Sequence, residues 1–205
     1  MIAKEGYPII ISALVATILF YIIPWFIWVT VSLLLLALFL WFFRDPERNT
    51  PIEQDIAVSA ADGKVVEVEE VEFKGEKYKK VGVFMNVFSV HVNRTPVTGT
   101  VTSIEHIAGK FVNASRKDAS IINERNIITF DTKYGKVIAV QVAGLVARRT
   151  VSYVKEGDLM ATGDRFGMIK FSSRVDHYFP LSATIQVEID DEVKAGESII
   201  AKFND

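Results

Sequence analysis

The feature that most constrains this chain is a run of 37 residues without a charged side chain, from Tyr7 to Phe43. A helix that crosses a bilayer core needs about 20 apolar residues, and the apolar core of a cleaved signal peptide has only about 7–15. Pro24 lies near the middle of the run, so we expect either one long, kinked span or a hairpin of two short spans that turns near Pro24. We favour the hairpin, because a single helix of this length would be about 55 Å long.

Charge separates this run from the rest of the chain. Only Lys4 and Glu5 are charged within residues 1–43, whereas residues 44–205 carry a balanced mixture with a net charge of −2. The chain has no basic block and a pI of about 6.0, which argues against a nucleic-acid partner. It has no cysteine, which excludes disulfides, thiolate zinc sites and a thiol nucleophile.

The stretch RDPERNTP, residues 44–51, contains two prolines, which disfavour helix and mark a linker. We therefore divide the chain into a membrane-associated hydrophobic segment at 1–43, a linker at 44–55 and a domain at 56–205. Arg44 and Arg48 follow the apolar run directly, and this excess of arginine favours a cytoplasmic location for the domain at the cell membrane.

The domain has the pattern of strands. KVVEVEEVEF alternates apolar and polar residues, and other stretches rich in Val and Phe stop at Gly or Pro. Residues 113–126 are the only stretch that fits a short helix or a long loop. The sequence therefore predicts a mainly β domain, a β-barrel or a barrel-sandwich-like fold, preceded by the helical membrane segment.

A faint internal repeat suggests one function. VKEGDLMATG at 154–163 aligns without gaps with VKAGESIIAK at 193–202, and such half-motifs resemble the biotinyl and lipoyl carriers. Lys170 would then be the lysine that carries the cofactor. The flanking methionines typical of that motif are replaced by Ile169 and Phe171, so an ordinary strand lysine is the better interpretation.

A serine, a histidine and an aspartate in separate segments suggest another function. Ser173 follows Ser172 in GMIKFSSRVDHYFP, His91 shares a predicted strand face with Ser89 and Asn93, and Asp62 lies in an Asp-Gly pair that could be only a β-turn. These types allow a membrane-tethered Ser/His/Asp hydrolase. The histidines lack metal-ligand spacing, so we expect no metal.

Four stretches in order carry a resemblance to a known family: FFRDPER, SAADGKV, VHVNRTPVTG and GDRFGMIKFSSRVDHYFP. Together they resemble the short (type A) class of phosphatidylserine decarboxylase proenzymes, which includes archaeal archaetidylserine decarboxylases. The resemblance covers nearly the whole chain. VHVNR-P and FGMI-F-SRVD are specific motifs, whereas ADG alone is not.

The resemblance implies a self-processing carboxy-lyase that converts a serine-headgroup phospholipid to the ethanolamine lipid and CO2. The Ser173 hydroxyl would attack the carbonyl of Ser172, and β-elimination would then cut the chain between them. Ser173 would become a pyruvoyl cofactor that forms a Schiff base with the substrate, in place of pyridoxal phosphate, for which the domain shows no signature. The products would be a β chain, 1–172, and an α chain, 173–205, in a heterodimer that stands alone or oligomerises further.

Two further residues take roles from the resemblance. Asp62 would belong to the apparatus that activates the serine, and His91 would be the proton donor or acceptor of the site. One position departs from the family pattern, which usually has Gly where this chain has Ser172. A Cβ at this position makes strained backbone more costly, so we expect it to affect the rate of cleavage.

Overall fold

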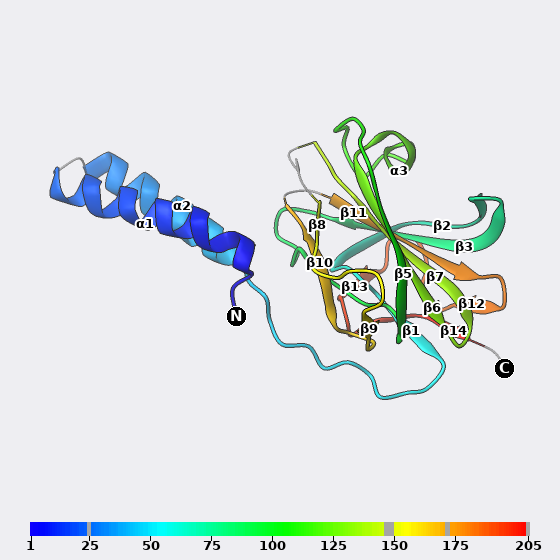
Figure 1. Cartoon of the computed structure of the whole chain (residues 1–205). Helices are drawn as coiled ribbons and strands as arrows, with labels where there is room; N and C mark the ends of the chain where they lie inside the picture. Colours follow the sequence, from blue (N-terminus) through cyan, green and yellow to red (C-terminus); the bar gives the residue numbers. More distant parts are fainter. Residues whose placement is uncertain (24–25, 146–149, 171–172, 204–205) are drawn as a thin grey trace. The chain divides into compact units, whose positions relative to one another are not determined.

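The uncharged run folds into two helices that pack against each other. The computed structural model describes residues 1–23, 26–145, 150–170 and 173–203. Its first unit, residues 1–47, holds a short 3-10 helix at Lys4–Gly6, α1 at Tyr7–Ile22 and α2 at Phe26–Phe42. α1 and α2 lie side by side (Figure 1). Lys4–Ile22 is long and apolar enough to cross a membrane, and Phe26–Phe42 is a shorter apolar helix.

Backbone hydrogen bonds join the residues before α1 to the residues after α2. The Ala3 amide donates to the Phe43 carbonyl at 2.8 Å, and the Asp45 amide donates to the Met1 carbonyl at 2.8 Å. Gly6 allows the close approach, because a Cβ there would lie 2.5 Å from Cγ of Phe43. The two ends of the segment are therefore joined to each other.

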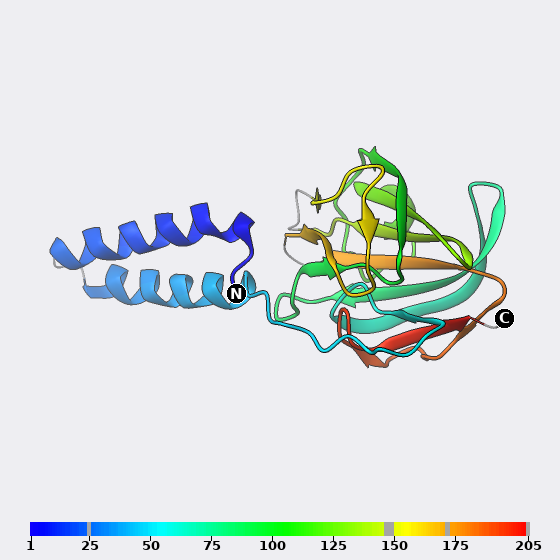
Figure 2. The same ribbon diagram turned by 60° about the horizontal axis from the view of Figure 1, so that its bottom comes forward.

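Residues 48–205 form the second unit, which is mainly β and thus confirms the predicted fold class. An eight-stranded sheet has the order β13-β2-β3-β11-β7-β6-β5-β9, and two three-stranded sheets have the orders β1-β14-β12 and β4-β10-β8. The large sheet is strongly curled (Figure 2). The elements are β1 Ile56–Val58, β2 Gly63–Phe73, β3 Glu76–Met85, β4 Val92–Arg94, β5 Gly99–Ile107, α3 Ala119–Ile122, β6 Arg125–Thr132, β7 Gly135–Val142, β8 Thr150–Ser152, β9 Leu159–Met160, β10 Arg165–Ile169, β11 Ser173–Pro180, β12 Ala183–Ile185, β13 Glu192–Val193 and β14 Ile199–Phe203.

The two aligned stretches of the internal repeat form the same kind of turn. The Asp158 amide donates to the Lys155 carbonyl, and the Glu197 amide donates to the Lys194 carbonyl. The third residue of each turn is a glycine with positive φ, Gly157 at 92° and Gly196 at 75°. This conformation is costly for a residue with a Cβ, so shared turn chemistry accounts for the similarity of the two stretches.

β11 is the strand around which the large sheet is organised, because it pairs with β3 on one side and β7 on the other. Alternate residues point to opposite faces of a strand. Val175 and Phe179 join the main apolar core inside the curled sheet, whereas Tyr178 joins a smaller apolar cluster on the other face. By this alternation Ser173 and His177 point inward, and Arg174 and Asp176 point outward.

The outward face of β11 carries a buried network of charges. The Arg174 guanidinium donates to the carboxylates of Asp176 and Glu67, and Lys80 lies 2.8 Å from Glu67. Burial alone would raise the pKa of Glu67, but Lys80 and Arg174 together hold that pKa below its ordinary value. Such a network is stable only while each charge keeps its partners.

Two backbone features make room for this network. β2 has a bulge between Val65 and Glu67, after which Glu67 lies opposite Gly82 of β3, and Gly82 lies opposite Asp176. Gly82 leaves the space that the guanidinium fills, since a Cβ there would lie 2.2 Å from Nη2 of Arg174.

We predict that Gly82→Ala destabilises the protein, because the added methyl group displaces the Arg174 guanidinium from its two carboxylates. Overpacking of this kind costs about 1–3 kcal/mol. Urea unfolding of the full-length protein in detergent, followed by the far-UV circular dichroism of the strands, measures the loss. An unchanged midpoint would show that the guanidinium does not need this space.

Candidate active site

Ser173 begins a strand of the curled sheet, and His91 lies next to a strand of the three-stranded sheet β4-β10-β8. Ser173 is the first residue of β11 and pairs with Met85, the last residue of β3. His91 immediately precedes β4, and its carbonyl accepts a hydrogen bond from the Ile169 amide at the end of β10, at 3.2 Å. Asn93, two residues after His91, contacts Met85, the strand partner of Ser173, and this contact links the two segments that the sequence singled out.

The Ser173 side chain is fully buried and points at sulfur. Its hydroxyl donates to Sδ of Met85 at 3.5 Å. The amide nitrogen of Asn93 approaches the same sulfur at 3.8 Å. A thioether is a weak acceptor, so neither donor is strongly engaged by it. The site therefore offers a serine hydroxyl and an amide donor in surroundings from which water is largely excluded.

His91 is also fully buried, and one of its ring nitrogens has a clear role. Nδ1 lies 2.9 Å from the Ser89 carbonyl, which can only accept, so Nδ1 carries the hydrogen. In the neutral ring Nε2 is then the nitrogen that can take up a proton and return it. This is the chemistry required of a general acid or base.

Asp62 lies at the same end of the sheet as Ser173 but has other partners. It precedes Gly63, the first residue of β2, and β2 is separated from β11 only by β3, so the backbones are about 10 Å apart. Both carboxylate oxygens accept from Arg48 at 2.8 Å, and one also accepts from the Ala195 amide at 2.8 Å. The carboxylate is thus bonded to these groups and not to Ser173 or His91.

Ser172, the other residue of the expected cleavage site, lies outside the described residues, as does Phe171. Lys170, the residue of the carrier alternative, follows the end of β10 and is partly buried.

A chain of polar side chains, buried except for His106, leads away from the sulfur beside Ser173, and most of it was not found from the sequence. The side-chain amide of Gln141 donates to Oδ1 of Asn93 at 2.8 Å, and the side-chain amide of Asn126 donates to Oε1 of Gln141 at 3.4 Å. Nδ1 of His106 lies 2.8 Å from Oδ1 of Asn126. These bonds fix which end of the Asn93 amide faces Met85. The only signal in the sequence was the strand alternation that placed Asn93 on the face of His91.

His177 is a second buried histidine, and both its nitrogens are used by the backbone. Nδ1 lies 2.9 Å from the Val81 carbonyl and must donate to it, and Nε2 accepts from the Ala60 amide at 2.8 Å. Burial lowers the pKa of His177 to about 4. The ring is therefore neutral at neutral pH and joins β3, β11 and the segment before β2.

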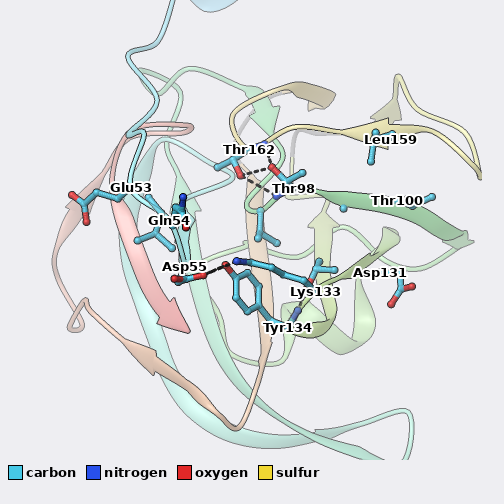
Figure 3. A pocket seen from close by; sticks show the side chains of 14 residues that line it. Glu53, Gln54, Asp55, Thr98, Thr100, Asp131, Lys133, Tyr134, Leu159 and Thr162 are labelled. Atoms are coloured by element: carbon cyan, nitrogen blue, oxygen red, sulfur yellow. Dashed lines mark hydrogen bonds and ion pairs between the residues drawn. The ribbon is translucent and has the colours of Figure 1, made fainter. Parts of the chain in front are cut away.

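One groove of the domain lies away from the residues that the sequence singled out. It has a volume of about 490 Å³ and is lined by the Asp55–Lys133 ion pair, Tyr134 and the hydroxyls of Thr98 and Thr162 (Figure 3). Lys133 and Tyr134 form the turn between β6 and β7, at the far end of the eight-residue β11, which is about 25 Å long. None of its lining residues is Ser173, His91 or Asp62.

Comparisons with known proteins place the chain in a family. Residues 35–201 match the family described as phosphatidylserine decarboxylase. In an alignment 207 positions long, the chain is 44% identical to the phosphatidylserine decarboxylase proenzyme of Syntrophus aciditrophicus (strain SB), covering 98% of this chain and 97% of the relative. It is also 44% identical to the phosphatidylserine decarboxylase proenzyme of Magnetococcus marinus (strain MC-1), covering 96% and 92%.

The structure defines a mainly β domain in which Ser173, at one end of the curled sheet, and His91, just before β4, are both buried. The chain belongs to the phosphatidylserine decarboxylase family. It is accordingly a decarboxylase, a carboxy-lyase of phospholipid metabolism, which decides against the hydrolase and carrier alternatives.

We predict that acid destabilises the protein through His177. Its pKa is about 4 when folded and 6.5 in the absence of these surroundings. The contribution of His177 to stability is therefore complete above the unfolded pKa and is lost as the pH falls toward the folded value. Between about pH 7.5 and about pH 5 the free energy of unfolding should therefore fall by roughly 2 kcal/mol.

Urea unfolding of the full-length protein at the two pH values measures this loss. The control is His177→Gln, which cannot titrate and should be less stable at neutral pH but fall less on acidification. An equal fall in both proteins would assign the pH dependence to other groups.

Proposed function

We propose that this chain is a self-processing decarboxylase that makes a pyruvoyl group from Ser173 and acts on phosphatidylserine or archaetidylserine. The observation that carries the proposal is the topology of residues 173–205. β11 lies between β3 and β7, β13 pairs with β2, and β14 lies between β1 and β12. A cut before Ser173 would therefore leave the α chain held by strand pairing to the β chain, residues 1–172, in a heterodimer.

Cleavage requires only groups of the chain itself and water. The Ser173 hydroxyl adds to the carbonyl carbon of Ser172, the amide C–N bond breaks, and the nitrogen takes a proton, which leaves an ester. Removal of the Cα proton of Ser173 then expels the Ser172 carboxylate. The dehydroalanine that remains tautomerises to an imine, and water replaces its nitrogen, which leaves as ammonia. The new α-chain terminus is a pyruvoyl group.

The described surroundings of Ser173 fit such a group. Among the described residues, the Asn93 amide nitrogen has only a weak sulfur acceptor, and it is suited to a carbonyl oxygen at position 173. The pyruvoyl carbonyl would supply the electron sink that a decarboxylation needs and that no ordinary side chain provides. His91 would deliver the proton to the substrate carbon through Nε2, since Nδ1 is committed to Ser89.

Asp62 is proposed to act in cleavage, through the position of its segment at the end of the sheet. Its ion pair with Arg48 is largely shielded from water, with 7% and 16% of the two side chains exposed. Breaking such a pair leaves an uncompensated charge and disturbs the segment that contains it. Asp62 would therefore help to hold the proenzyme in the form that cleaves.

The apolar first unit supports a location at the cell membrane, where the lipid substrate also lies. We propose that the catalytic domain is on the cytoplasmic side, because Arg44 and Arg48 directly follow the apolar helices.

We predict that Ser173→Ala remains a single, inactive chain, because alanine has no hydroxyl to attack the preceding carbonyl. Ser172→Ala is the matched control and should still split, since its carbonyl remains. Intact-mass analysis of the purified proteins shows the products, with residues 173–205 carrying a ketone in place of the amine in the wild type. Splitting of Ser173→Ala at this place would overturn the assignment.

His91 and Asp62 should give separate phenotypes. His91→Ala should split but lose roughly 10²–10⁴-fold in turnover, the contribution typical of a general acid or base. Asp62→Asn should slow splitting in a time course after cell-free synthesis. Normal turnover of the cleaved His91→Ala protein would remove His91 from the reaction.

Arg48→Met is the control for Asp62, because it breaks the same ion pair and keeps the carboxylate. If Arg48→Met slows splitting as much as Asp62→Asn does, Asp62 acts through the ion pair. If only Asp62→Asn slows splitting, the carboxylate itself takes part.

A further inference from the structure

Two loops extend past Ser173 and carry exposed apolar side chains. Val87 and Phe88 follow the last residue of β3, which pairs with Ser173, and they are 42% and 66% exposed. Leu145 lies three residues after Val142, the last residue of β7, which pairs with Arg174, and it is 65% exposed. The register of the sheet therefore places both loops beyond the same strand ends as the serine.

The same strands end differently at their other ends. The turn between β2 and β3 contains Lys74, which pairs with Glu105, and the turn between β6 and β7 contains Lys133, which pairs with Asp55. Apolar side chains are exposed at that end too, among them Leu159 and Leu181, but these two are single residues on separate segments, and single exposed apolar residues are normal. At the end that holds Ser173, Val87 and Phe88 are adjacent in the chain, and Leu145 lies beyond the end of β7.

Charge also distinguishes these loops. No acidic residue occurs between Glu76 and Glu105 or between Asp131 and Glu156, and these two stretches contain the loops. Residues 86–91 hold no Lys or Arg either, and Arg148 and Arg149, outside the described residues, follow Leu145 in the sequence. Exposed Phe and Leu side chains can enter the apolar part of a bilayer interface, and loops without carboxylates are not repelled by anionic lipid headgroups.

We propose that the loops at residues 86–90 and 143–145 dock on a lipid bilayer that contains anionic lipid, with Val87, Phe88 and Leu145 entering its interface. The choice of a bilayer as partner rests on the proposed function, because a lipid substrate must reach Ser173 from the membrane. It is also consistent with the apolar helices of the same chain.

The docking loop is directly connected to the site. The Ser89 carbonyl, one residue after Phe88, accepts the hydrogen of Nδ1 of His91. Insertion of Phe88 would therefore bring the lipid headgroup to the residue proposed to protonate it, and would order the carbonyl that sets the tautomer of that residue.

A labelling experiment tests the docking without any assay of catalysis. The chain has no cysteine, so Phe88→Cys and Leu145→Cys each accept one environment-sensitive fluorophore. Leu159→Cys is the matched control, since Leu159 is 75% exposed at the other end. The full-length proteins are reconstituted in phosphatidylcholine vesicles with and without phosphatidylserine, and with lipids that carry a nitroxide on the acyl chain.

The proposal expects blue-shifted emission and several-fold stronger nitroxide quenching for the labels at 88 and 145 than for the label at 159, with the difference larger when phosphatidylserine is present. Quenching no stronger than at 159 would overturn it. A blue shift without nitroxide quenching would also overturn it, because it would mean that a second protein copy covers the loops. These readouts do not depend on whether Ser173 becomes a pyruvoyl group.

An activity ratio gives the second test. Phe88→Asp and Leu145→Asp should lower the ratio of turnover on vesicle-embedded phosphatidylserine to turnover on a monomeric short-chain phosphatidylserine by at least about tenfold, and Leu159→Asp should not. An equal loss on both substrates would assign the loops to the site itself and contradict docking. Absence of turnover in the wild type would refute the proposed function and leave the quenching result to decide on docking.

Discussion

The position of β11 between β3 and β7 is the constraint on which the rest of the domain depends. Its backbone is hydrogen-bonded to a strand on each side, and its two faces carry different kinds of side chain. The inner face adds apolar residues and a neutral His177 to the core, and the outer face places Arg174 between two carboxylates. The first residue of this strand is therefore held in place by contacts that do not involve the peptide bond before it.

The class of fold could be predicted from the sequence, and so could some residues of the candidate site, because the signals for both are local. An uncharged apolar run, strand alternation and short motifs around Ser173 and His91 can each be recognised within a few residues. The mainly β fold and the family follow from such signals, and the structure and the comparisons confirm both.

The remaining features depend on partners far apart in the chain. Glu67 lies in KVVEVEEVEF, where alternation predicts a solvated face, but the bulge in β2 and the space at Gly82 bury it beside Arg174. Burial lowers the pKa of His177, and its two nitrogens bond to Ala60 and Val81, neither of which is near it in sequence. The Arg48–Asp62 pair likewise joins the linker predicted at 44–55 to the start of a strand.

The hydrogen bonds between the two ends of the helix pair have a consequence for how this apolar segment would insert into a bilayer. Residues 1–3 are bonded to residues 43–45, so the chain leaves the pair beside the point where it enters. Between Tyr7 and Phe43 there is no charged side chain. A segment of this kind can enter a bilayer from one face without carrying any charge or folded domain across it, so the first residue and the catalytic domain would stay in the same compartment.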